Sequence, residues 1–274
     1  MDVQMNGTAL YAEQQGVGPS LVFVHGMCGD ASVWADQVAR LSDRFQCTTY
    51  DRRGHTRSPR TEATECVELH ADDLASLITA LDLAPTIVVG SSSGARVTLD
   101  LIRRCPRLVH GAVLSEPPVG ALAPDLFEAM IDAVAPAVKR ASNTDGPRAA
   151  VDAFFDAVCP GLWSRIDESH KDRYRDNAPM LFADLAMPPY RITRVDIACI
   201  DVPTLVVAGR ASHPALRTAA HTLSMWLPDA RHLELDCGHV TYAEQPQGFA
   251  DAVAAFGAEL RDRYSPSLRG PAPW

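Results

Sequence analysis

The chain has 274 residues, 47% of them hydrophobic and 22% charged, which is the composition of a globular protein and excludes disorder, collagen or a coiled coil for its bulk. Asp and Glu number 34 against 25 Lys and Arg, so the formal net charge is −9. An acidic chain is a poor partner for nucleic acid or an anionic membrane, because both bind basic surfaces. The length suits one large α/β domain.

The seven cysteines are widely spaced and contain no C-x-x-C pair, so neither a zinc site nor a disulfide framework is expected. The N-terminal residues have no basic start and no apolar run, and therefore do not resemble a secretory signal. These features predict reduced thiols and a cytoplasmic location. No metal and no cofactor is expected, since the sequence contains no phosphate-binding glycine loop.

Strand and helix patterns alternate over much of the chain. The Asn6-Gly7 pair between two short strand patterns, residues 3–5 and 9–13, is typical of a β-hairpin. Continuous apolar runs at 21–25 and 86–89 indicate strands buried on both faces. Further strands are expected at 46–50, 111–115, 204–208 and 232–235, and helices at 33–41, 67–81, 95–104, 215–227 and 243 to about 261. This alternation predicts an α/β fold with a mainly parallel sheet wrapped by helices.

Residues 118–200 interrupt the alternation. They show helical spacing at 127–138, 149–158 and 171–185 without a convincing strand, which predicts a helical cap between two parts of a core, 1–117 and 201–264. The cap has more aromatic residues than exposed helices need, and we expect Phe127, Trp163 and Tyr190 to contact substrate. Residues 265–274 are rich in Pro and Gly and are expected to form a flexible tail.

The pentapeptide Gly90-Ser91-Ser92-Ser93-Gly94 follows a buried strand and opens a helix. In that context G-x-S-x-G predicts a nucleophilic serine on a sharp strand-to-helix turn, and only Ser92 has glycine at both required offsets. A serine nucleophile needs a base. His239 follows Gly238 in the loop after the last predicted strand, where it can reach the same edge of the sheet, so it is the predicted base.

Four segments together resemble the successive signatures of the α/β-hydrolase superfamily: Val24-His25-Gly26, the stretch from Tyr50 to Ser58, Gly90 to Gly94, and Gly238-His239. The resemblance implies a twisted, mostly parallel sheet of about eight strands with a helical cap over it. It also implies an oxyanion hole made by the backbone N–H groups of Met27 and Ser93. In the family, the loop that holds Asp51, Arg53 and His55 here is mostly a structural turn.

The triad acid departs from the pattern. Family members usually carry an aspartate after the strand that here reads TLVVAG, but this position holds Ser212, which cannot stabilise an imidazolium by charge. Some members take the acid from the preceding strand end, where this chain has Glu116 before Pro117-Pro118. Glu116 is therefore the predicted acid. Asp236 and Asp201 remain alternatives, and Glu116 could instead be a carboxylate at the pocket rim.

A serine–histidine–glutamate set with the Ser-Glu-Pro-Pro stretch is similar to zearalenone lactonases, which open a resorcylic macrolactone. The expected reaction is hydrolysis of an ester or lactone through an acyl-enzyme, with a hydrophobic small molecule as the partner and a lactone favoured. The residues expected to contact it, beyond the cap aromatics, are Gly26, Cys28, Pro117, Pro118 and Val240.

Other readings of the same fold stay open, because one fold hosts many functions. The serine at position 92 argues against haloalkane dehalogenases and epoxide hydrolases, which need an aspartate there. A C–C bond hydrolase, a cofactor-free peroxidase-like member and a non-catalytic small-molecule receptor are the alternatives. Association as a homodimer is also left open.

Overall fold

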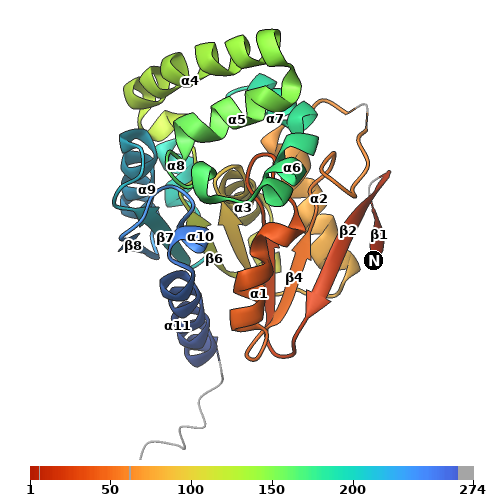
Figure 1. Cartoon of the computed structure of the whole chain (residues 1–274). Helices are drawn as coiled ribbons and strands as arrows, with labels where there is room; N and C mark the ends of the chain where they lie inside the picture. Colours follow the sequence, from red (N-terminus) through yellow and green to blue (C-terminus); the bar gives the residue numbers. More distant parts are fainter. Residues whose placement is uncertain (6, 62, 265–274) are drawn as a thin grey trace, which may run out of the picture.

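The computed structural model describes residues 1–5, 7–61 and 63–264, in which eight strands form one sheet with the order β1-β2-β4-β3-β5-β6-β7-β8 (Figure 1). Strands β3 to β8 run parallel, whereas β2 is antiparallel to both β1 and β4. This arrangement confirms the predicted α/β-hydrolase fold. The strands are β1 (Asp2–Met5), β2 (Thr8–Gln15), β3 (Ser20–Val24), β4 (Gln46–Tyr50), β5 (Thr86–Ser91), β6 (Val109–Ser115), β7 (Thr204–Gly209) and β8 (Ala230–Leu235).

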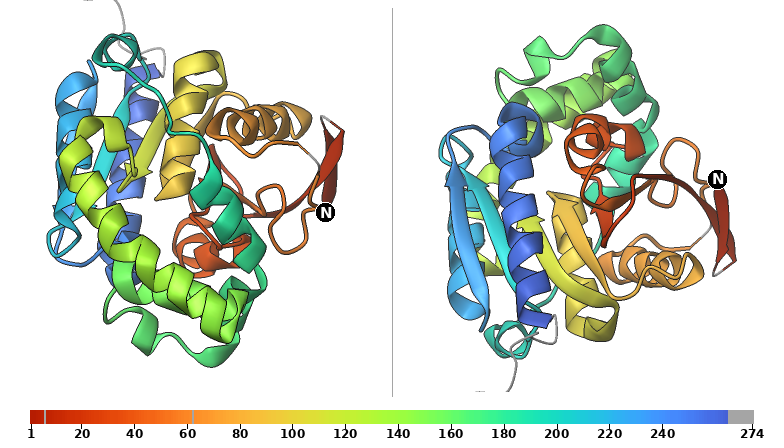
Figure 2. Two further views of the ribbon diagram at one scale, coloured as in Figure 1. Left: turned by 90° about the horizontal axis from the view of Figure 1, so that it is seen from above. Right: turned by 90° about the horizontal axis from the view of Figure 1, so that it is seen from below.

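Helices cover both faces of the sheet (Figure 2). Two lie on one face, α1 (Ala35–Leu41) and α11 (Pro246–Tyr264), and they contact each other. The other face is covered by α2 (Val67–Ala80), α3 (Ser93–Arg104) and α9 (Pro214–Trp226). The short α10 (Thr241–Glu244) precedes α11, and single 3-10 turns occur at η1 (Ala31–Trp34) and η2 (Pro106–Leu108).

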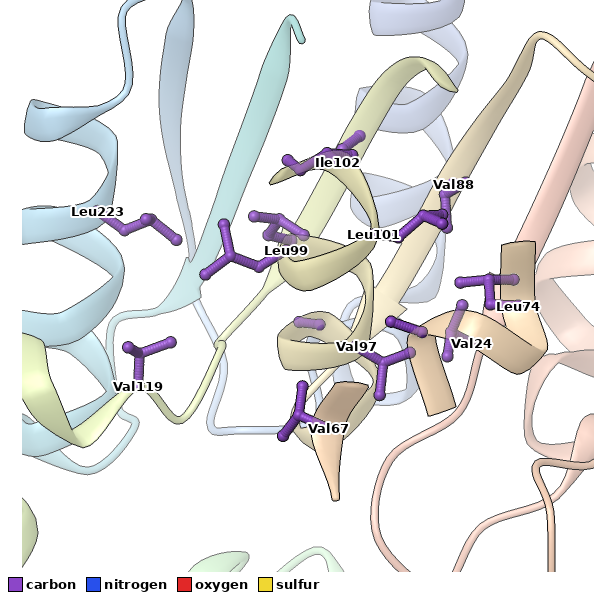
Figure 3. Packing of buried hydrophobic residues seen from close by; sticks show 14 of the residues in the cluster. Val24, Val67, Leu74, Val88, Val97, Leu99, Leu101, Ile102, Val119 and Leu223 are labelled. Atoms are coloured by element: carbon purple, nitrogen blue, oxygen red, sulfur yellow. The ribbon is translucent and has the colours of Figure 1, made fainter. Parts of the chain in front are cut away.

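Each central strand contributes alternate residues to two separate cores, because successive side chains of a strand point to opposite faces. In β3, Phe23 packs toward α1 and α11 while its neighbours Val22 and Val24 face the opposite core. Burial of both faces explains why these strands read as continuous apolar runs. Figure 3 shows the larger core, where side chains of α3 meet those of β5, α2 and α9; its labelled members are Val24, Val67, Leu74, Val88, Val97, Leu99, Leu101, Ile102, Val119 and Leu223.

Between β6 and β7 the chain forms helices and no strand, and most of these helices lie together above the sheet in Figure 1. Those between residues 124 and 186 share a small apolar cluster that includes Val151, Trp163 and Leu181 and that reaches Cys28 in the loop after β3, whereas Leu122 and Ile197 pack in the larger core. These elements are η3 (Gly120–Leu122), α4 (Pro124–Asp145), α5 (Pro147–Val158), η4 (Trp163–Arg165), α6 (Glu168–Asp176), α7 (Ala178–Ala186) and α8 (Arg194–Ala198).

The helix expected over residues 171–185 is instead two helices, α6 and α7, which part at Asn177, and the short helix α8 was not predicted. Pro179 in the first turn of α7 favours this break, since a proline has no N–H to donate to a carbonyl of the preceding turn. Among the described residues, no helix combines the length and apolarity needed to cross a membrane. The tail prediction for 265–274 concerns residues outside those described.

Candidate active site

Ser92 stands at the sharp turn between β5 and α3. Its φ of 52° and ψ of −122° lie in a strained region for a residue with a side chain, and its backbone N–H donates to Ser115 O at 2.9 Å. Gly90 and Gly94 make the turn feasible. A Cβ on Gly94 would overlap the carbonyl oxygens that end β3, and one on Gly90 would overlap α3 itself. The G-x-S-x-G pattern thus encodes close backbone packing, which holds the serine hydroxyl clear of the strand.

His239 lies in the loop between β8 and α10, and its Nε2 is 3.1 Å from Ser92 Oγ. The ring is buried, with 7% of its surface exposed. Glu244 on α10 fixes this loop, because its carboxylate accepts hydrogen bonds from the backbone N–H groups on both sides of the histidine, Gly238 at 3.0 Å and Val240 at 3.1 Å. Glu244 was not singled out from the sequence. Its position one turn after a glycine-histidine loop is the only sequence signal for it.

Glu116 follows β6 directly, with a φ of 48°, and is fully buried. Its Oε2 is 2.8 Å from His239 Nδ1, and its Oε1 accepts the backbone N–H of Gly209 at 2.7 Å. The structure therefore brings the three predicted residues into one hydrogen-bonded chain, Ser92–His239–Glu116. Such an arrangement lets the carboxylate orient the imidazole and stabilise its cation.

Ser212 occupies the position at which the family usually has its aspartate, and it is buried beside Glu116. Its hydroxyl donates a hydrogen bond to Glu116 Oε2, the same oxygen that His239 contacts. The ends of β6 and β7 thus meet beside His239: the residue after β6 provides the carboxylate, and the loop after β7 provides a neutral hydroxyl that donates to it. The other acids considered, Asp236 and Asp201, are exposed, and neither bonds to His239 in the part of the chain that the structure describes.

The predicted oxyanion donors flank Ser92. Ser93 is the first residue of α3, so its N–H has no partner within the helix and lies at the positive end of the helix dipole. Met27 lies in the loop after β3 and lines the same cavity as Ser92. The next residue, Cys28, has a φ of 57°, and its carbonyl accepts from the side chain of Asn177 at 3.1 Å. The cap therefore holds the loop that carries one of the two predicted donors.

Two adjoining cavities lead to Ser92. The inner one, of about 40 Å³, is lined by Ser92 and His239 and lies beneath α5. The outer one, of about 370 Å³, lies between the cap and the loop after β3 and does not include either catalytic side chain in its lining. Residues lining both are Gly29, Phe155, Cys159, Tyr174, Val240 and Tyr242.

Four of the eight predicted substrate contacts line these cavities. Gly26 lines the inner cavity, Cys28 and Trp163 the outer one, and Val240 both. Pro117, Pro118, Phe127 and Tyr190 line neither. Phe127 and Tyr190 pack in the large core, where the Tyr190 hydroxyl donates to Asp100 at 3.1 Å.

Phe155 and Tyr174 were among the cap aromatics but were not chosen as substrate contacts, although both line the two cavities. Phe155 stacks on Trp163 with ring centroids 4.7 Å apart, and Tyr174 meets the same ring edge-on. Helical spacing alone could not separate the aromatics that face the core from those that face the cavity. Burial raises the pKa of the Cys28 and Cys159 thiols, so both cavity cysteines stay protonated near neutral pH.

The turn after β4 is held by buried hydrogen bonds. Asp51 accepts from Ala31 N at 2.8 Å and from the Arg57 guanidinium, while Arg53 pairs with Asp73 at 2.8 Å. His55 Nδ1 bonds to the Arg53 carbonyl oxygen at 2.9 Å. These contacts give the loop a structural part, as the resemblance implies.

Residues 21–252 match the model of the family described as the alpha/beta hydrolase family. Together with the eight-stranded sheet and the serine on its strand-to-helix turn, this match defines the class: the chain belongs to the alpha/beta hydrolase family. It is 34% identical over 236 residues, covering 83% of each chain, to the 2-(acetamidomethylene)succinate hydrolase of Mesorhizobium japonicum. It is also 38% identical over 117 residues to the uncharacterized hydrolase YraK of Bacillus subtilis, a match that covers only 42% of this chain and 43% of YraK.

Among solved structures, the enol-lactonase of Burkholderia xenovorans superposes with a TM-score of 0.79 at 23% identity, covering 94% of this chain and all of the other. An esterase from Thermogutta terrifontis superposes with a TM-score of 0.76 at 20% identity, with 95% and 98% coverage. At this level of identity the likeness establishes a shared fold, and function has to be argued from the site.

Proposed function

We propose that this protein is a serine hydrolase that cleaves the ester bond of a small molecule through an acyl-enzyme. The observation that supports this most directly is the continuous hydrogen-bonded chain from Ser92 Oγ through His239 to Glu116, beside a cavity that a substrate can enter. A binding module without catalysis would have no need of a strained serine aligned with a buried histidine–carboxylate pair.

In this mechanism, Ser92 Oγ attacks the carbonyl carbon while His239 Nε2 takes its proton. The N–H groups of Met27 and Ser93 stabilise the negative oxygen of the tetrahedral intermediate. When that intermediate collapses, His239 gives the proton to the leaving alcohol and the acyl group stays on Ser92. Water then attacks the acyl-enzyme with His239 as base, releasing the acid and restoring the serine. Glu116 keeps the imidazole in the required tautomer throughout.

Within the ester class, the layout of the triad, taken without the shape of the cavities, points to a lactone, with a zearalenone-type macrolactone as the specific member. This choice depends on the glutamate after β6 and the Ser-Glu-Pro-Pro stretch around it, which are the features that resemble those lactonases.

A second candidate substrate follows from the relative with 34% identity over 83% of each chain. That protein is named for 2-(acetamidomethylene)succinate, whose cleaved bond need not be an ester. The compound therefore belongs in the substrate panel beside esters and lactones.

The test compares hydrolysis of p-nitrophenyl acetate and butyrate by the wild type, Ser92→Ala, Glu116→Gln and Asp236→Asn. We expect Ser92→Ala and Glu116→Gln to lose at least ~100-fold in kcat, because each removes one member of a concerted set. Asp236→Asn, an exposed acid on the same loop as His239, is the matched control and should retain activity. Intact-mass measurement after mixing with substrate should detect the acyl group on the wild type and on Asp236→Asn but not on Ser92→Ala.

Activity retained by Ser92→Ala would exclude the acyl-enzyme. A wild type inactive on every ester, every lactone and the acetamido compound would move the C–C hydrolase and receptor alternatives ahead. A receptor would then show thermal stabilisation by its ligand without turnover.

A further inference from the structure

The two cavities at the catalytic site differ about ninefold in volume, roughly 40 Å³ inside and 370 Å³ outside. Pockets that bind drug-sized molecules are typically about 300–1,000 Å³, so only the outer cavity can hold the body of such a substrate. The carbonyl must nevertheless reach Ser92, which lines the inner cavity alone. One substituent of the carbonyl must therefore fit the inner cavity, while the other extends into the outer cavity.

The walls of the inner cavity limit what fits there. On the cap side it is lined by Phe154 and Val158 of α5, which do not line the outer cavity, and on the side of the loop after β3 by Gly26 and Met27. A water needs at least about 10–15 Å³ of such space, so a volume of about 40 Å³ corresponds to a few heavy atoms. An acetyl group is of that size, whereas a long acyl chain is not.

The position of His239 decides which substituent goes outward. The leaving oxygen must lie near His239 Nε2, because it receives its proton there. Of the residues that follow His239 in the chain, Val240 and Tyr242 line both cavities and Ala243 lines the outer one alone, so this segment leads from the inner cavity to the outer one. The leaving alcohol therefore has a path along this segment into the outer cavity, and the acyl group is left against α5.

We infer that the substrate is an open-chain ester of a short acid with a bulky, largely apolar alcohol. The inference rests on the proposed function and narrows its substrate class. It ranks a macrolactone lower, since a large ring joins the acyl carbon to the alcohol and leaves no short end for the inner cavity. The apolar walls of the outer cavity, among them Trp163, Phe155 and Ile166, suit an aromatic or alicyclic alcohol.

The experiment varies each half of the ester in turn, with phenyl acetate, 2-naphthyl acetate and phenyl octanoate as substrates. Phenol and 2-naphthol are leaving groups of similar acidity, so differences between their acetates report on fit. We expect kcat/KM for phenyl octanoate to be at least ~10-fold below that for phenyl acetate, given the usual cost of excess length in a closed pocket. The value for 2-naphthyl acetate should equal or exceed that for phenyl acetate.

Two variants test whether the inner cavity is what limits the length of the acyl chain. Val158→Ala enlarges the inner cavity and should raise the octanoate-to-acetate ratio by about 10-fold, on the order of one hydrophobic pocket contact. Ile166→Ala removes a comparable side chain that lines only the outer cavity, and should leave that ratio unchanged. Phe154→Ala gives a second enlargement if Val158→Ala folds poorly.

Equal or better use of phenyl octanoate, or an unchanged ratio in both enlarged variants, would overturn the inference, as would hydrolysis of zearalenone as efficient as that of the acetates. In each case the Ser92-dependent acetate activity remains, so these results are distinct from failure of the proposed function. Loss of the proposed function would instead appear as acetate hydrolysis that survives Ser92→Ala.

Discussion

At the residue scale, the defining feature is that residues from two strand ends, β6 and β7, together form the acidic partner of His239. Glu116 supplies the charge after β6, and Ser212 supplies a hydrogen bond to the same carboxylate oxygen after β7. With Gly209 N–H on the other oxygen, the buried carboxylate has three donors, which offsets the loss of its hydration. Ser212 therefore has a role at the position where the family usually has its aspartate, because its hydroxyl hydrogen-bonds to Glu116 and helps to position that carboxylate.

This coupling predicts that Ser212→Ala lowers kcat by about 10-fold, in line with losing one hydrogen bond to a charged group, while Ser212→Thr retains activity. In the Glu116→Gln background the same alanine should cost little more, because the carboxylate it positions is gone. The kcat of the two single variants and the double variant measures this coupling. Fully additive losses would mean that Ser212 acts independently of Glu116.

The sequence predicted the three residues of the hydrogen-bonded chain better than the residues that line the cavities around it. Ser92 and His239 lie in short motifs whose flanking glycines indicate the backbone geometry. Glu116 could be inferred because the position that usually holds the triad aspartate is occupied by the uncharged Ser212. The cavity lining could not be inferred in this way. Phe127 and Phe155 lie on similarly spaced apolar faces of neighbouring helices, yet one enters the core and the other faces the cavity.

At the scale of elements, the strands were predictable to within a few residues because burial on both faces leaves a continuous apolar run. The break between α6 and α7 was missed, and it turns out to be where the cap meets the core. Asn177 at that break is 2% exposed, and its amide donates to the carbonyl oxygens of Cys28 and Gly29 at 3.1 and 3.2 Å. It also accepts from Thr56 N at 2.8 Å.

We predict that Asn177→Ala destabilises the fold by about 1–3 kcal/mol, because two buried carbonyl groups lose a donor. It should also lower kcat, since the loop of Met27 loses its support. Asn177→Asp keeps the shape but sets a charged acceptor against those oxygens, and should be at least as harmful. Thermal unfolding and ester hydrolysis measure both effects, with the exposed Asn143→Ala of α4 as the control. A normal kcat in both Asn177 variants would contradict this role.

At the scale of the whole molecule, the sheet and the cap meet around a buried set of charged and titratable groups. His25 and His55 are both fully buried, with ring centroids 4.8 Å apart, and both face Arg52. Arg52 forms an ion pair with Asp184 of α7 at 3.1 Å, in which neither side chain is exposed to solvent by more than 1%. This pair ties the cap to the turn after β4.

Burial, reinforced by the positive charge of Arg52, holds the pKa of both His25 and His55 well below the usual 6.5. The contacts give the reason. Each ring uses Nδ1 toward a backbone carbonyl oxygen, and each Nε2 faces an N–H group of Arg52. A proton on Nε2 would point at an N–H group of Arg52, which is itself a donor, and the protonated ring would be repelled by the positive charge of the Arg52 guanidinium.

The protein should therefore lose stability as the pH falls below about 6.5. The unfolded chain takes up these two protons while the folded chain does not, so the free energy of unfolding falls by about 1.4 kcal/mol per histidine at one pH unit below the ordinary pKa. Asp184, whose pKa is lowered, loses its contribution only below its ordinary value of 3.8, outside this window. We expect Tm to drop by about 5 °C between pH 7.5 and pH 5.5.

Replacing one buried ring separates this effect from general acid sensitivity. His55→Gln lowers Tm at every pH but removes one of the two fully buried rings, so its drop between pH 7.5 and pH 5.5 should be smaller than that of the wild type by about half of what the buried pair contributes. The exposed His170→Gln should show the full drop, because that ring bonds only to the exposed Asp167 on its own helix. An equal drop in all three proteins would assign the acid sensitivity to other groups and leave the buried pair without a part in it.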